Sequence, residues 1–171
     1  MGVCGIVLAA GAGTRAGGPK ALTPGWIASA CAALLDGGCA RVVVVLGAAP
    51  HAPIPADNRI TSIIATDWAS GMSHSLRAGL NAACGDAALI TLVDLPGLPT
   101  TVVERVIAAD GDLRQAVFGG RPGHPVYISA AHWQLPLSGD HGARQYLVAT
   151  GVNEVECGDL WNGEDVDGPL R

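Results

Sequence analysis

Short apolar runs that alternate with helical stretches set the strongest limit on how this chain can fold. The apolar runs span residues 3–10, 41–47, 60–65 and 87–93. The stretches with helical character span residues 26–35, 72–84, 100–109 and 140–149. Apolar runs this short are typical of strands buried on both faces of a sheet. The alternation therefore predicts an α/β fold around a mostly parallel sheet.

The last third of the chain predicts strands with a different connection. Residues 115–118 and 124–129 can pair as a hairpin across residues 119–123, and residues 153–157 favour a last short strand. A hairpin sets one strand antiparallel to its neighbour, so we expect a mixed sheet. No repeat, linker or block of charge divides the chain, which predicts a single domain over residues 1–171.

The composition excludes several classes of protein. The apolar fraction of 49% is too high for a disordered chain, although only 15% of the residues are charged. The net charge of -5 argues against broad binding of nucleic acid or of an anionic membrane, because both need a basic face. We therefore expect small-molecule partners, with no nucleic acid and no membrane among them.

The cysteines and the N-terminal segment bear on the cellular compartment. The cysteine count of five is odd and no CxxC pair occurs, which favours buried free thiols over a disulfide framework or a zinc site. Residues 3–10 are too short to span a bilayer and do not follow a basic segment as a secretory signal would. These features predict a cytoplasmic protein.

One lysine stands among ten basic residues. The other nine are arginines, so Lys20 is the only primary ammonium on a side chain. A general bias toward arginine explains this distribution. A requirement at position 20 for a compact ammonium rather than a planar guanidinium explains it equally well. The sequence leaves both explanations open.

The segment after the first apolar run carries the strongest chemical signal. Residues 11–25 contain five glycines and two prolines, which predicts a long loop. Glycines let backbone N–H groups surround an anion, and Arg15 and Lys20 add two positive charges to the same loop. Ligands of α/β sheets bind beyond the carboxyl ends of the strands, so we expect this loop to meet Asp94 and the segment after Ala65. The combination suits a polyphosphate.

Other interpretations of the loop fit less well. A plain turn would leave two cations without a partner. Residues 11–16 match the dinucleotide pattern GxGxxG/A, but that pattern needs a helix at the glycines and an acid after the second strand. Residues 17–19 (GGP) disfavour the helix, and residues 46–48 (LGA) hold no acid. The Walker A pattern is absent, because Lys20 is followed by alanine.

Asp94 is the first candidate metal ligand. It follows the apolar run 87–93 directly, and Mg²⁺ prefers carboxylate and phosphate oxygens. The alternative is that its side chain caps an Asx turn before Leu95 and Pro96.

The loop LAAGAGTRAGGPK (8–20) resembles the signature LAAGxxxRxGxPK of the MobA- and MocA-like nucleotidyltransferases, which attach a nucleotide to molybdopterin. Further segments follow in the family's order: GMSHSLRAGL (71–80), VDLPGLP (93–99), GRPGHPVYIS (120–129), GDHGAR (139–144) and DVDGP (165–169). The resemblance implies a three-layer Rossmann-like fold of the nucleotide-diphospho-sugar transferase type. It also implies Mg²⁺-dependent transfer of a nucleoside monophosphate from a nucleoside triphosphate (NTP) to a phosphorylated acceptor, with release of pyrophosphate.

The resemblance also implies roles for single residues. Arg15, Lys20 and Asp94 would be catalytic, with Asp94 and Asp167 on the metal and Asp165 in reserve. His124 would face the acceptor. The implied nucleotide-binding residues are Leu8, Ala9, Ala10, Gly11, Ala12, Gly13 and Thr14 in the loop, and Ser73, Ser75 and Gly79 near the nucleoside.

Departures from the family's pattern leave alternatives open. Ala10 gives LAAG where guanylyl-transferring relatives carry LAGG, which favours CTP over GTP and molybdopterin as the acceptor. Phospho-sugar transferases use a similar loop, so a phospho-sugar is the alternative acceptor. Gly168 replaces the family's threonine beside the second metal ligand. That change motivates a further alternative, a non-catalytic nucleotide-binding or regulatory protein of the same fold.

Overall fold

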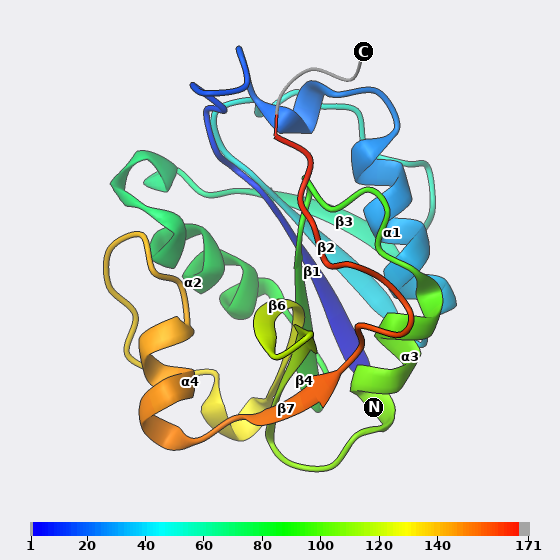
Figure 1. The fold of residues 1–171 in the computed structure, drawn as a ribbon. Coiled ribbons are helices and arrows are strands. Elements are labelled where there is room, and N and C mark those ends of the chain that lie inside the picture. Colours follow the sequence, from blue (N-terminus) through cyan, green and yellow to red (C-terminus); the bar gives the residue numbers. More distant parts are fainter. Residues whose placement is uncertain (1, 168–171) are drawn as a thin grey trace.

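A seven-stranded sheet forms the centre of the molecule in a computed structural model that describes residues 2–167 (Figure 1). Its strand order is β3-β2-β1-β4-β6-β5-β7. The strands are β1 (Val3–Ala9), β2 (Arg41–Leu46), β3 (Ile60–Ile64), β4 (Ala87–Leu92), β5 (Leu113–Phe118), β6 (Arg121–Ser129) and β7 (Asn153–Glu156). The helices are α1 (Trp26–Asp36), α2 (Met72–Ala82), α3 (Thr100–Ala108) and α4 (Arg144–Thr150).

The sheet is mixed and mostly parallel, as predicted. β1 pairs in parallel with β2 and β4, β2 pairs in parallel with β3, and β5 pairs in parallel with β7. β6 alone runs against its neighbours, β4 and β5. The apolar runs 3–10, 41–47 and 87–93 form β1, β2 and β4, whose two faces are both covered, so these strands have no exposed side for polar residues. The run 60–65 is expected to be buried in the same way, but it forms β3 at the edge of the sheet, where no second strand of residues 2–167 covers it and its residues are exposed or half-buried.

Helices cover both faces of the sheet and make three layers (Figure 1). α1 and α3 pack on one face, over a core that includes Leu34, Val44 and Val103. α2 and α4 lie on the other face, over a core that includes Ile6, Leu76 and Leu147. Successive residues of β1 point to opposite cores, so this strand links the two layers of side chains.

The structure corrects three local predictions. The hairpin turn is only Gly119 and Gly120, both with positive φ, so β6 begins at Arg121 rather than at residue 124. Gly142 also has positive φ, which an α-helix does not allow, so α4 begins at Arg144 rather than at residue 140. The two threonines at positions 100 and 101 predict a threonine near the N-cap of α3, but the N-cap residue is Pro99 and no side chain caps the helix.

The remaining elements agree with the prediction to within one or two residues at their ends. The five cysteines are free thiols, as expected, and all but Cys84 are buried. Within residues 2–167, no helix has the length and hydrophobicity needed to cross a membrane.

Candidate active site

The carboxyl ends of β1 and β4 open into a cavity of about 380 Å³. Leu8 to Gly11 form one wall after β1, and Leu92 to Asp94 form another after β4. Trp68 and Ser75, from the segment that follows β3, close the cavity on a third side. The three segments that the sequence predicts to meet therefore do meet, because parallel strands deliver their ends to the same edge of the sheet.

The glycine-rich loop is folded around one carbonyl group. The N–H groups of Ala16 and Gly18 donate to the carbonyl oxygen of Gly13, at 2.9 and 3.0 Å. Gly13 has a φ of +60°, and a Cβ placed on it would lie 1.8 Å from the carbonyl oxygen of Gly18. Only glycine fits this position. The turn bends the chain so that Thr14 and Arg15 face a second open cavity, of about 440 Å³, together with Lys20.

Lys20 lies at the junction of the two cavities and contacts two carboxylates. Its Nζ donates to Asp94 Oδ2 at 2.7 Å and to Asp167 Oδ1 at 3.0 Å. Burial of the side chain opposes the charge, but the hydrogen bonds and the attraction to both carboxylates outweigh burial and raise the pKa of Lys20. The ammonium is therefore charged throughout the physiological range.

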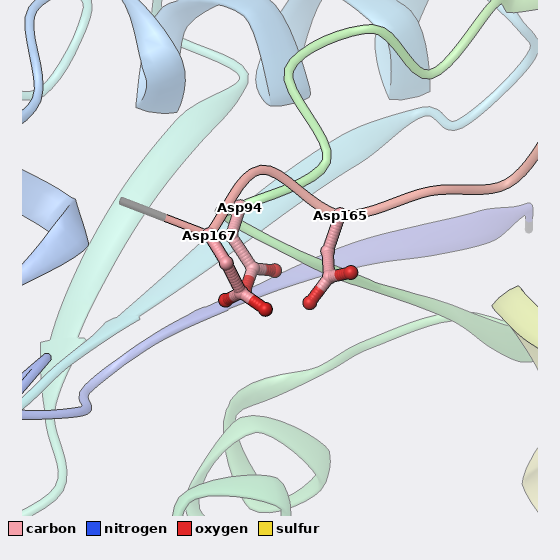
Figure 2. Close-up of side chains that lie close together, drawn as sticks. All are labelled: Asp94, Asp165 and Asp167. Atoms are coloured by element: carbon pink, nitrogen blue, oxygen red, sulfur yellow. The ribbon is translucent and has the colours of Figure 1, made fainter. Parts of the chain in front are cut away.

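Three carboxylates gather at this junction. Figure 2 shows Asp94, Asp165 and Asp167 beside the end of β4, and one oxygen from each lies within 4.8 Å of the others. The N–H of Val166 donates to the carbonyl oxygen of Asp94 at 2.9 Å and holds the C-terminal segment against this strand end. Asp94 Oδ1 is buried and has no hydrogen-bond partner within residues 2–167. A hard divalent cation fits this set of oxygens.

A third cavity, of about 430 Å³, adjoins the first and shares Leu8 and Met72 with it. Its walls are apolar side chains of α2, β4, β6 and α4, and its polar groups include His124, Arg121 and Arg144. Burial, partly offset by the negative charge of Asp94, lowers the pKa of His124 to about 4. The imidazole is therefore neutral at pH 7.

The other residues expected near the nucleoside lie in different surroundings. Ser75 lines the first cavity. Ser73 is buried, and its Oγ has no hydrogen-bond partner among the described residues. Gly79 lies farther along α2 and packs on the sheet, where an added Cβ would be 2.9 Å from Ile6 Cγ2. For Gly79 the structure shows a packing contact rather than a cavity wall.

Sequence reasoning missed several residues of the cavities. Trp68 and Asp140 line the first cavity, and Arg144 lines the third. Asp140 and Arg144 belong to the segment GDHGAR (139–144), which carries the family resemblance and could have indicated them. Nothing in the sequence distinguishes Trp68, which reaches the cavity only through the path of the chain after β3.

A family model described as the MobA-like NTP transferase domain matches residues 5–154. The chain belongs to this family. Nicotine blue oxidoreductase of Paenarthrobacter nicotinovorans is 39% identical to this MobA-like chain over 189 aligned residues, which cover 96% of the chain and 92% of the relative. The predicted family is thereby confirmed, and the chain is assigned to the nucleotidyltransferase enzymes.

Solved structures show the same fold. Rv0371c of Mycobacterium tuberculosis H37Rv has a TM-score of 0.83 at 22% identity, covering 98% of this chain and 94% of that chain. A manganese complex of the same protein has a TM-score of 0.72 at 21% identity, covering 92% and 88%. The inositol-1-phosphate CTP transferase of T. maritima has a TM-score of 0.77 at 16% identity, covering 97% and 89%. These likenesses confirm the predicted fold class.

Proposed function

We propose that this MobA-like enzyme transfers a nucleoside monophosphate from an NTP, preferably CTP, to a phosphorylated acceptor, preferably molybdopterin. An oxygen of the acceptor phosphate attacks the α-phosphorus, and the bond from that phosphorus to the bridging oxygen breaks as pyrophosphate leaves. The observation that carries the proposal is the meeting of Lys20, Asp94 and Asp167 at the mouth of the glycine-rich loop.

The loop and its cations supply the phosphate-binding part of the reaction. The backbone N–H groups of residues 10–14 would surround the triphosphate, and Arg15 and Lys20 would balance its charge. Arg15 is exposed and has no side-chain partner within residues 2–167, so it is free to take an anion. Transfers at phosphorus depend mainly on alignment and on neutralising the growing negative charge, which is what such groups provide.

The carboxylate cluster supports a divalent metal, preferably Mg²⁺. Asp94, Asp165 and Asp167 would hold it, because their oxygens converge and one buried oxygen of Asp94 lacks a partner. When bound, the metal would neutralise charge on the phosphates of the nucleotide. The manganese complex of the structural relative from M. tuberculosis agrees with a divalent ion in this fold.

The third cavity is the proposed acceptor site. Arg121 and Arg144 would bind the acceptor phosphate, and neutral His124 would hydrogen-bond the acceptor without adding charge. Apolar side chains make up most of the lining, Gln115 and His141 add further polar groups, and no carboxylate of residues 2–167 lines this cavity. A sugar presents many hydroxyls that need polar partners. The apolar part of the lining suits a flat ring such as that of molybdopterin, and a phospho-sugar stays the alternative acceptor.

Pyrophosphate release tests the proposal. Each of CTP, GTP, ATP and UTP is supplied with Mg²⁺, alone, with molybdopterin or with inositol 1-phosphate. We expect release with CTP and molybdopterin, and a loss of about a hundredfold in Asp94→Asn. Asp159→Asn is the matched control, because Asp159 is an exposed carboxylate paired with Arg105 on the surface. NTP binding without release for any acceptor would support the non-catalytic alternative instead.

A second candidate function rests on the 39% identical relative, which is named an oxidoreductase of nicotine blue. In that case a nicotinamide nucleotide would occupy the loop, and its hydride would pass to a dye in the third cavity. Oxidation of NADH or NADPH, followed at 340 nm with nicotine blue present, tests this candidate. Hydride transfer that survives Asp94→Asn would favour it over nucleotidyl transfer.

A further inference from the structure

The carboxylate cluster already contains a cation of the protein's own. The ammonium of Lys20 lies against Asp94 and Asp167, two of the three groups assigned to the metal (Figure 2 shows the carboxylates). We propose that Lys20 is the resident cation of this cluster in the nucleotide-free enzyme, and that it moves to the triphosphate when the metal enters with the nucleotide. The inference rests on the proposed function, since it assigns an order of binding to the same site.

The geometry makes the two cations competitors. The contacts of Lys20 Nζ are 2.7 Å to Asp94 Oδ2 and 3.0 Å to Asp167 Oδ1. One oxygen from each carboxylate lies within 4.8 Å of the others, so the cluster is about as wide as the shell of one ion. Two positive charges in this space repel each other in surroundings that are only partly open to water. A metal on the remaining oxygens, Asp94 Oδ1 among them, would therefore weaken the hold of the cluster on Lys20, and Lys20 in place would weaken the binding of the metal.

The surroundings offer Lys20 a place to go. The ammonium borders the open cavity that is also lined by Thr14 and Arg15 on one side and Asp167 on the other. Because Lys20 itself lines this cavity, its side chain has open space beside it into which it can turn. A triphosphate held by the loop would attract it there and would replace the charge interactions it gives up.

This exchange explains the choice of residue at position 20. Lysine is a compact charge on a flexible stem, with three donors that can change partners. Arginine would bind a carboxylate through two parallel hydrogen bonds and would hold the cluster more firmly. The other nine basic residues of the chain are arginines. A lysine at position 20 is thus expected if this cation must leave its partners during each reaction cycle.

Metal binding without nucleotide is the first test. Mn²⁺ is titrated into the nucleotide-free full chain and free Mn²⁺ is followed by electron paramagnetic resonance. We expect Lys20→Met to bind Mn²⁺ about tenfold more tightly than the parent, since the competing charged hydrogen bonds are gone. Arg15→Gln removes a cation of the same loop that has no carboxylate partner among the described residues, and we expect a change below about twofold there. Equal or weaker binding in Lys20→Met would overturn the proposal.

The second test uses the parent protein, so it does not depend on the variant folding. Biosynthetic incorporation of lysine labelled with ¹³C at Cε leaves the ammonium intact, and the one lysine gives one labelled side-chain signal. The Lys20 signal should shift when the α,β-methylene analogue of CTP is added with Mg²⁺. Mg²⁺ alone at the same concentration should shift it much less. An equal shift with Mg²⁺ alone, or none with the analogue, would contradict the exchange.

The two proposals fail in different ways. A shift of the Lys20 signal without pyrophosphate release from the NTP, whichever acceptor is present, would support the exchange and argue against the transferase activity. Pyrophosphate release by the parent enzyme, together with an unchanged Mn²⁺ affinity in Lys20→Met, would support the transferase activity and argue against the exchange.

Discussion

At the scale of single residues, the chemistry of the site depends on which groups share the carboxylates. Lys20 is held by two of them, and the third, Asp165, completes the cluster. The family resemblance implies Asp167 as the second metal ligand and Asp165 only as its substitute. The structure brings both carboxylates close to Asp94. A departure at Gly168 therefore does not prevent the cluster from forming, because the three carboxylates themselves converge.

Replacement of Lys20 by arginine is the first prediction. Lys20→Arg retains the charge but adds a planar, two-pronged donor, so we expect turnover to fall by about tenfold or more while thermal stability stays near that of the parent. Initial rates of pyrophosphate release and a thermal melt measure the two effects. A variant with the turnover of the parent would mean that arginine bias alone explains the lone lysine.

The neutral His124 predicts a pH dependence of stability. Its pKa in the folded protein is about 4, below the ordinary value of 6.5, so the unfolded chain binds more protons between these values. Its contribution is complete well above pH 6.5 and is lost as the pH falls toward 4, with about 2 kcal/mol lost between pH 7 and pH 5. Urea unfolding at pH 7 and pH 5 measures this loss. We expect a smaller loss in His124→Gln, and an equal loss would refute the assignment to this residue.

At the scale of elements, the predictions that were wrong concern the residues at which a helix or a strand begins. Glycines with positive φ account for the two largest differences between predicted and observed elements. Gly142 makes α4 begin later than predicted, and Gly119 and Gly120 form a hairpin turn that is shorter than predicted. Glycine permits positive φ but does not require it, so the sequence cannot say which glycine will use that freedom. Surrounding contacts decide, such as the N–H of Ser73 donating to the carbonyl oxygen of Gly139.

The glycine-rich loop gives the prediction for this scale. Gly13→Ala forces a side chain into a positive-φ turn and against the carbonyl of Gly18, so we expect a loss of about 1–3 kcal/mol in unfolding free energy. Gly11→Ala is the matched control, because a Cβ at Gly11 meets no atom within 4 Å. Denaturant unfolding of both variants measures the difference. Equal stabilities would show that the loop does not hold this turn in solution.

At the scale of the whole molecule, packing controls which thiols can react. Cys4, Cys31, Cys39 and Cys157 are buried and Cys84 is exposed. Burial raises the pKa of Cys31 and of Cys39 to about 12, so neither forms thiolate at pH 8 in the folded state. We expect Ellman's reagent to titrate one thiol in the native protein and five in guanidinium. More than one fast-reacting thiol in the native state would contradict the packing of these layers.

The sequence by itself determined most of the strands and helices and the glycine-rich loop. These depend on apolar runs, on glycine and proline, and on charges close together in the chain, and such local signals act without the rest of the fold. The order of elements also predicted that the strand ends would meet at one edge.

Only the tertiary structure decided which side chains share the site. Asp94 and Asp167 are far apart in the chain and meet because the C-terminal segment returns to the end of β4 and bonds there through Val166. The third cavity, the proposed acceptor site, likewise exists only where α2, α4 and β6 face one another. Contacts between distant segments follow from packing of the whole chain, and no local pattern encodes them.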